Sequence, residues 1–167
     1  GVETFVRETA LRMMDRGHDV SILSGLGMLT SESKELARSG LQFKLFPFIR
    51  RYTKLSDTVL SLSRSLMHSE LTPYAIESFS MLPFGLTYLL RHEHDVVAIV
   101  GMSDSLARIA VKCRTILHYQ GGKISNWQIQ YLNKIPPNCI IACSQFTAEQ
   151  LRNNRINCPI YSIPNGV

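Results

Sequence analysis

The stretch GVETFVRETALRMMDRGHDVSIL, residues 1–23, decides the fold of this chain. Within residues 2–14 the apolar side chains recur at the three- and four-residue spacing of one helix face. Gly17 follows where a left-handed residue would end a helix, and residues 20–23 are apolar enough for a short strand. We therefore predict a helix, a glycine turn and a strand, which together form half of a parallel β-α-β crossover. The strand that should precede Gly1 is expected to be missing.

The start of this predicted helix has the properties of an anion-binding site. The first N–H groups of a helix lack intrahelical partners, and Gly1 has no Cβ to keep a ligand away. Glu3, in the first turn, also interacts favourably with the helix dipole for purely structural reasons.

Downstream, short apolar runs alternate with helical patterns. We predict strands at 41–46, 96–100, 115–119, 139–143 and 159–163, and helices at 33–38, 55–69, 74–91, 104–112, 126–133 and 147–153. The helix at 74–91 is apolar almost all round, so it should be largely buried, and Pro83 and Gly85 should bend or split it. Apolar strands that alternate with helices predict an α/β fold, in which helices cover both faces of a mainly parallel sheet.

Composition limits the classes of protein. A chain of 167 residues suits one domain with a real core, and 45% apolar with 19% charged residues is typical of a soluble globular protein. No apolar run approaches the roughly 20 residues that span a bilayer. The net charge of +5 fits an anionic ligand or a membrane surface without choosing between them. The four cysteines have no CxxC spacing, which favours buried free thiols over a disulfide or zinc site; they are Cys113, Cys139, Cys143 and Cys158.

Candidate site residues follow the predicted strands, because ligands of open α/β sheets bind outside the carboxyl ends of the strands. His118 interrupts a core strand near that end, where Leu or Val would pack better. It is either a hydrogen-bonded core histidine or a group that lines the cleft, and its position favours the cleft. Ser144 either caps the next helix or contacts a ligand, and the cap is at least as well supported.

Two further segments have alternative interpretations. Residues 46–54, FPFIRRYTK, are basic and aromatic, and an ordinary surface loop is the simpler interpretation. The alternative is that they lie against anionic lipid or receive an anionic acceptor. The run is too short to argue for nucleic-acid binding. Residues 92–94, HEH, suit a solvated helix end better than a metal pair.

Three segments together resemble a known family. Residues 1–20 resemble the opening Gly-rich loop, first helix and second strand of retaining GT-B glycosyltransferases of the family 4 type, the group that includes bacterial lipid mannosyltransferases. Residues 143–147, CSQFT, resemble the S-E-x-x turn of that family, although Gln145 replaces its acidic residue. Residues 163–167, IPNGV, resemble the segment that closes the N-terminal domain of the family.

The resemblance implies that residues 1–167 form the N-terminal, acceptor-side domain, a Rossmann-like three-layer sandwich that lacks its first strand. The C-terminal, donor-binding domain would be absent, so the fragment alone should be inactive. The implied substrates are a nucleotide-sugar donor and a saccharide, lipid or small-molecule acceptor, with no metal and no cofactor. The implied location is the cytoplasm, with or without peripheral contact at the membrane face.

The resemblance also implies roles for single residues. His118 would be catalytic, close to the donor sugar, and Gly1 and Val2 would lie near the donor diphosphate. The implied substrate-binding residues are Glu3, Tyr119, Gly121, Ser144 and Asn165. Two other interpretations stay open. The chain could be a non-catalytic Rossmann-like binding or scaffold module, or an epimerase or phosphorylase relative on the same fold.

Overall fold

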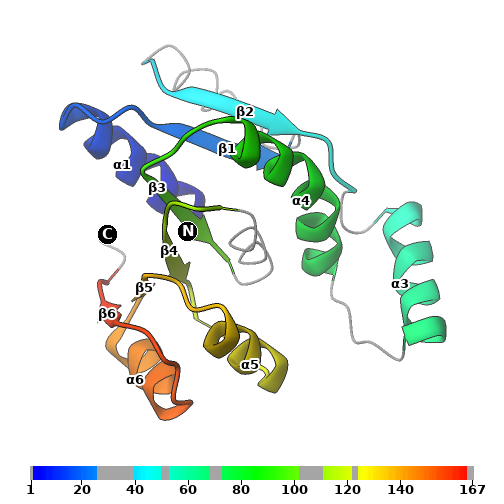
Figure 1. Ribbon diagram of the computed structural model, residues 1–167. Helices are drawn as coiled ribbons and strands as arrows, with labels where there is room; N and C mark the ends of the chain where they lie inside the picture. Colours follow the sequence, from blue (N-terminus) through cyan, green and yellow to red (C-terminus); the bar gives the residue numbers. More distant parts are fainter. Residues whose placement is uncertain are drawn as a thin grey trace. The chain divides into compact units, whose positions relative to one another are not determined.

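The computed structural model describes residues 2–25, 40–49, 53–67, 73–101, 111–121 and 124–164, and Figure 1 shows its helices and strands. The helix predicted at 33–38 and residues 104–110 of the helix predicted at 104–112 lie outside these residues, whereas residues 111 and 112, predicted to end that second helix, are not helical. The chain divides into two compact units, which consist mainly of residues 3–85 and 86–167. Each unit is described by itself, and the expectation that 1–167 is a single domain stays a prediction.

In the first unit, helix α1 (Val2–Asp15) confirms the helix predicted from the opening stretch. Gly17 ends it with a φ of +86°, a conformation that glycine adopts without strain. The Gly17 N–H donates to the Met14 carbonyl at 2.8 Å, and the His18 N–H donates to the Met13 carbonyl at 3.2 Å. This pair of bonds is the Schellman motif, so a glycine stop read from the sequence is also the stop in the structure.

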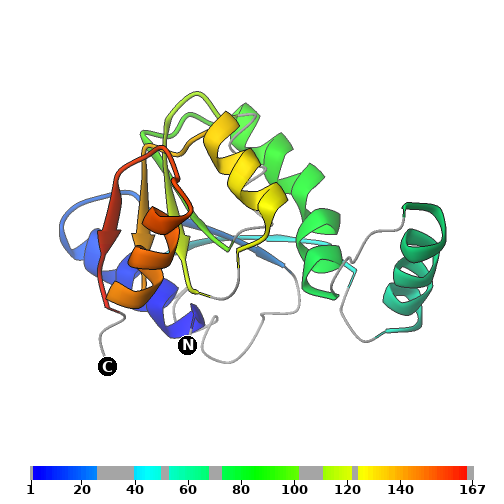
Figure 2. The same ribbon diagram turned by 90° about the horizontal axis from the view of Figure 1, so that it is seen from below.

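Strands β1 (Ser21–Gly25) and β2 (Gln42–Phe46) follow and form a parallel pair in which Ser21 lies opposite Gln42. They run side by side in Figure 1 and Figure 2. Apart from the exposed Gln42, the side chains of β2 are half-buried. A Cβ built on Gly25 would lie 2.6 Å from the Phe48 ring, so the end of β1 has room only for glycine.

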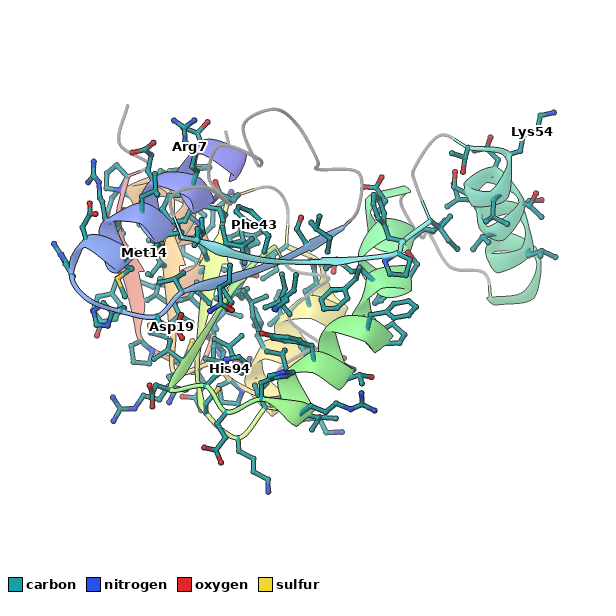
Figure 3. The ribbon with its side chains drawn as sticks, turned by 90° about the horizontal axis from the view of Figure 1, so that it is seen from above. Arg7, Met14, Asp19, Phe43, Lys54 and His94 are labelled. Atoms are coloured by element: carbon teal, nitrogen blue, oxygen red, sulfur yellow. The ribbon has the colours of Figure 1, made fainter. Side chains whose placement is uncertain are left out.

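Helices α3 (Lys54–Met67) and α4 (Pro73–Arg91) lie where the sequence predicted helices. The exposure of their side chains differs from what the apolar patterns predicted. On α3 the apolar side chains Leu55 and Leu62 are exposed, whereas Ser56 is buried. Ser56 exchanges hydrogen bonds with Thr53 at the start of the helix, where the Thr53 N–H donates to Ser56 Oγ at 3.0 Å. Figure 3 labels Lys54 at this end of α3. Apolar spacing identifies the face that can be buried, but neighbouring elements decide whether it is.

Helix α4 corrects two expectations. Pro83 does not split it: α4 is one helix of 19 residues, because a proline removes a single backbone donor while the other helical hydrogen bonds can persist. The predicted bend stays a prediction. It is also not largely buried: among its described side chains Ile76 is buried, whereas Phe84 and Leu90 are exposed. The middle of the helix contacts the end of β2, since the Phe84 ring stacks on Phe46 with centroids 6.5 Å apart.

The second unit contains a four-stranded parallel sheet in the order β3-β4-β5-β6. The strands are β3 (Val96–Val100), β4 (Arg114–Tyr119), β5 (Cys139–Ala142) and β6 (Ile160–Ser162), all within about one residue of the predicted ends. Helix α5 (Asn126–Lys134) connects β4 to β5, and α6 (Gln145–Asn153) connects β5 to β6 and packs on both (Figure 2). The α/β class and the parallel pairing are confirmed, although the described strands form two sheets rather than one.

The core of this unit contains a large, fully buried side chain from each of four elements. These residues are Leu117 of β4, Leu132 of α5, Ile140 of β5 and Leu151 of α6. An asparagine anchors the start of β5 beside β4: the Thr115 N–H donates to Asn138 Oδ1 at 2.7 Å, and the Asn138 N–H returns a bond to the Thr115 carbonyl at 2.9 Å. These contacts hold the amino ends of β4 and β5 together.

Candidate functional site

His118 lies near the end of β4, an inner strand of the four-stranded sheet. The strand register places Val100 of β3 and Ile141 of β5 on either side of it. Only 3% of the residue is exposed, so neighbouring strands restrict the orientation of the imidazole ring. Burial lowers the pKa of His118 from its ordinary 6.5, which keeps the ring neutral near pH 7.

Gln120 is the polar partner of His118. Side chains two residues apart on an extended chain project from the same face of a sheet, which brings the Gln120 amide to the imidazole. The Gln120 side-chain nitrogen hydrogen-bonds to Nδ1 of His118. The site therefore contains a neutral, oriented imidazole rather than a free one.

Tyr119 follows His118 on the strand, so its side chain projects from the opposite face of the sheet. It is buried, and its carbonyl accepts a hydrogen bond from the Cys143 N–H at 3.2 Å, which joins the ends of β4 and β5. Burial raises the pKa of the Tyr119 phenol, and the nearby Cys143 raises it further. The phenol therefore stays protonated at neutral pH.

Ser144 is the N-cap of α6. Its Oγ accepts a hydrogen bond from the Thr147 N–H at 3.1 Å and lies 2.8 Å from the Thr147 hydroxyl. Thr147 is itself buried, and its hydroxyl lies 3.8 Å from Cys143 Sγ. Of the two interpretations of Ser144, the structure shows the cap.

Gly121 forms the turn after β4, next to the start of α6. It has a φ of +97°, and a Cβ built there would lie 3.5 Å from Thr147 Oγ1 and 3.9 Å from Cys143 Sγ. The structure thus brings Gly121 and Ser144 together at the carboxyl edge of the sheet, where their strands end. His118 and Tyr119 supply the last two side chains of β4 at the same edge.

The other predicted site residues are not placed. Gly1 and Asn165 lie outside the described residues. Val2 and Glu3 begin α1, as predicted for a helix opening, but their side chains lie outside the described part of the chain. Of the basic segment 46–54, residues 50–52 are likewise outside it, so contact with lipid stays a prediction.

Cysteine and histidine clusters do not form a metal centre in the described part of the chain, where no group of three His, Cys, Asp or Glu side chains could hold an ion.

All four cysteines are free thiols, but they are half-buried rather than buried, because each lies at an end of an element or in a loop. His92 is exposed and stacks on Tyr88, with ring centroids 4.1 Å apart, whereas His94 is half-buried. The described helices include none long and apolar enough to cross a membrane.

Three contributors were absent from the predicted set: Gln120, Thr147 and Cys143. The sequence did contain a signal for two of them. Gln120 follows His118 by two residues, which is the spacing of side chains on one face of an extended chain. Thr147 follows Ser144 by three residues, which is the spacing between a helix N-cap side chain and the backbone N–H that donates to it. Contact of Cys143 with Thr147 depends on how the chain leaves β5, which no local pattern predicts.

The arrangement can bind and orient a ligand by hydrogen bonds. At neutral pH its buried titratable groups, the His118 imidazole and the Tyr119 phenol, are both uncharged, and each has a proton to donate. The Gly121 turn exposes backbone close to the start of α6, an end of a helix at which N–H groups attract negative charge. Such a site stabilises charge by fixed dipoles rather than by a strong base.

Comparison with known proteins adds one finding. The family model described as Glycosyltransferase Family 4 matches residues 1–167, the entire length of the chain. Comparisons with curated proteins and with solved structures gave no significant match.

Proposed function

Because the chain belongs to glycosyltransferase family 4, we propose that it is the N-terminal, acceptor-side domain of a retaining glycosyltransferase that uses a nucleotide-sugar donor. The family match over residues 1–167 carries this proposal. The acceptor is a saccharide, a lipid or a small molecule, and the lipid mannosyltransferases are the relatives suggested by the opening stretch. A second, donor-binding domain completes the cleft.

His118 is the proposed catalytic residue, and it acts through a hydrogen bond to the donor sugar. The support is its place at the carboxyl end of β4 and its neutral, buried state. Leaving-group charge on the diphosphate is stabilised mainly by helix dipoles and by cationic groups of the second domain, because a neutral imidazole supplies no positive charge. The acceptor hydroxyl attacks from the face that the leaving group occupies, which retains the anomeric configuration.

The isolated chain is expected to be nearly inactive, since half of the groups that position the donor belong to the second domain. The test compares the 167-residue chain with a longer protein that includes the donor-binding domain, using a panel of sugar nucleotides and acceptors. We expect transfer by the longer protein only, with a product whose anomeric configuration, read by NMR coupling constants, equals that of the donor. Equal turnover by the short chain, or an inverted product, would contradict the proposal.

A variant pair tests the role of His118 in the longer protein. His118→Ala should lower kcat/KM by about 10²-fold, the range for losing one well-placed polar group at a reacting centre. His92→Ala is the matched control, because His92 is exposed and should leave kcat/KM unchanged. The same assay separates the alternatives: an epimerase isomerises the donor without acceptor, a phosphorylase requires free phosphate, and a scaffold module does neither.

A further inference from the structure

We propose that Gln120 is a positioning residue that holds the neutral His118 ring as the Nε2–H tautomer, so that His118 meets its ligand as a hydrogen-bond donor. The identity of that ligand, the donor sugar, rests on the proposed function. The tautomer does not, because it follows from contacts within the second unit. The two claims can therefore fail separately.

The contact between Gln120 and His118 is built into the strand. Gln120 is the first residue after β4, two positions beyond His118, and its carboxamide nitrogen meets Nδ1 of the imidazole. His118 is buried, with Val100 and Ile141 as its neighbours across the sheet. Close packing on both sides restricts rotation of the ring, so Nδ1 and Nε2 keep distinct surroundings.

The donor and acceptor inventory of the two side chains then assigns the proton. A carboxamide nitrogen carries two hydrogens and can only donate. Nδ1 of His118 must therefore accept, which requires its lone pair to be free of a proton. A neutral imidazole has one proton on its two nitrogens, and that proton must be on Nε2.

This assignment limits what His118 can do. An Nε2–H group donates to a hydroxyl or ring oxygen, and it cannot take a proton at that atom. In the proposed reaction His118 would orient the donor sugar and polarise an oxygen, and it would not act as a general base through Nε2. The deprotonation of the acceptor hydroxyl is left to another group.

NMR of the chain labelled with ¹⁵N-histidine tests the tautomer directly. The resonances of His118 are assigned by their loss in His118→Asn. We expect a pyrrole-type, protonated Nε2 and a pyridine-type Nδ1 at neutral pH. A pyridine-type Nε2, or a pair of averaged resonances from two exchanging tautomers, would overturn the proposal.

Substitutions at Gln120 should move the same resonances. In Gln120→Glu a carboxylate, which only accepts, should draw the proton to Nδ1 and exchange the two resonance types. In Gln120→Met, which has similar length and no polar group, the two tautomers should average. Gln128→Glu is the matched control, because Gln128 interacts with Ser125 at the start of α5, and the His118 resonances should not move. If Gln120→Glu fails to fold, the spectra of the wild type and of Gln120→Met still decide whether the proposed tautomer is correct.

Kinetics of the longer protein separate this proposal from the proposed function. Gln120→Glu should lower kcat/KM about tenfold, the effect of one lost hydrogen bond, whereas Gln128→Glu should not. If the wild-type protein transfers sugar but Nε2 is pyridine-type, the tautomer is wrong and the function stands. If Nε2 is protonated but the protein transfers no sugar to any acceptor, the proposed function fails and the tautomer stands.

Discussion

At the scale of single residues, the buried polar side chains of β4 set the chemistry of the candidate site. His118 and Tyr119 adjoin in sequence but project from opposite faces of the sheet, and burial keeps both uncharged. Each also has a fixed neighbour, Gln120 for His118 and Cys143 for the Tyr119 backbone. Such a pair is suited to hydrogen bonding and poorly suited to transferring charge.

The lowered pKa of His118 predicts a pH dependence of stability. Above pH 6.5 the ring is neutral in both the folded and the unfolded chain, and the group does not affect stability. As the pH falls below 6.5, the unfolded chain binds a proton that the folded chain does not. The free energy of unfolding should therefore decrease, by at most about 1.4 kcal/mol per pH unit, until the folded pKa is reached.

Urea unfolding of the wild type and of His118→Gln between pH 7.5 and about 5 measures this effect, since the difference between their slopes isolates one site. The wild type should lose stability more steeply on acidification. Parallel slopes would show that His118 has the same pKa in the folded and unfolded chain.

Gly121 is a second residue at which a substitution has a predictable cost. Its φ of +97° is strained for any other residue, so Gly121→Ala should destabilise the protein by about 1–2 kcal/mol. Space is not the cause, because the added Cβ would be in ordinary contact with Thr147. Gly85→Ala is the control: Gly85 lies inside α4 with nothing within 4 Å, and alanine there should stabilise by about 0.5–1 kcal/mol. Urea midpoints that move in the same direction would contradict this account.

At the scale of elements, the start of α6 shows how a helix end becomes part of a site. Ser144 satisfies the Thr147 N–H, and Thr147 in turn contacts Cys143 and lies against Gly121. One helix cap thus connects the ends of β4 and β5. Gln145, which replaces the acidic residue of the family-like turn, takes no part in these contacts: it is exposed, and its side-chain nitrogen donates to Glu149 along the helix.

Removing this cap should be measurable. Ser144→Ala deletes the acceptor for the Thr147 N–H and should lower the free energy of unfolding by about 1 kcal/mol. Ser144→Asp keeps an oxygen that can cap the helix and should stay close to the wild type. Urea unfolding followed by circular dichroism measures both. Equal losses in the two variants would mean that the cap contributes little and that the bond to the Thr147 hydroxyl matters more.

At the scale of the molecule, the second unit has its own core and the first has helices with exposed apolar faces. Side chains of β4, β5, α5 and α6 interlock in the second unit, whereas Leu55 and Leu62 of α3 face solvent in the first. Periodicity alone does not distinguish these cases. The difference lies in which elements have a partner.

Two substitutions in the second unit test where its stability resides. Ile140→Ala removes a side chain with 0% exposure and should cost about 2–5 kcal/mol, because the cavity can collapse only partly. Leu90→Ala removes one that is 66% exposed and should change stability by less than about 0.5 kcal/mol. Thermal and urea unfolding measure both. A loss at Leu90 as large as that at Ile140 would show that α4 is buried in solution.

The sequence by itself determined the type and order of the described elements and, to within about two residues, where they begin and end. The helix that stops at Gly17, the apolar strands of the second unit and the serine before α6 all follow from interactions over a few residues. Hydrophobic spacing and the conformations open to glycine act at that range, so they can be read from the chain.

Only the tertiary structure decided which strands pair, that the described strands form two sheets, and which apolar faces stay exposed. It also decided that the Gln120 amide meets Nδ1 of His118 and that Gly121 lies against Thr147. Pairing and burial depend on partners far apart in the chain, and contact between two side chains depends on exact placement. Neither is encoded in the local spacing of residues, so the candidate site emerges only when the strands lie side by side.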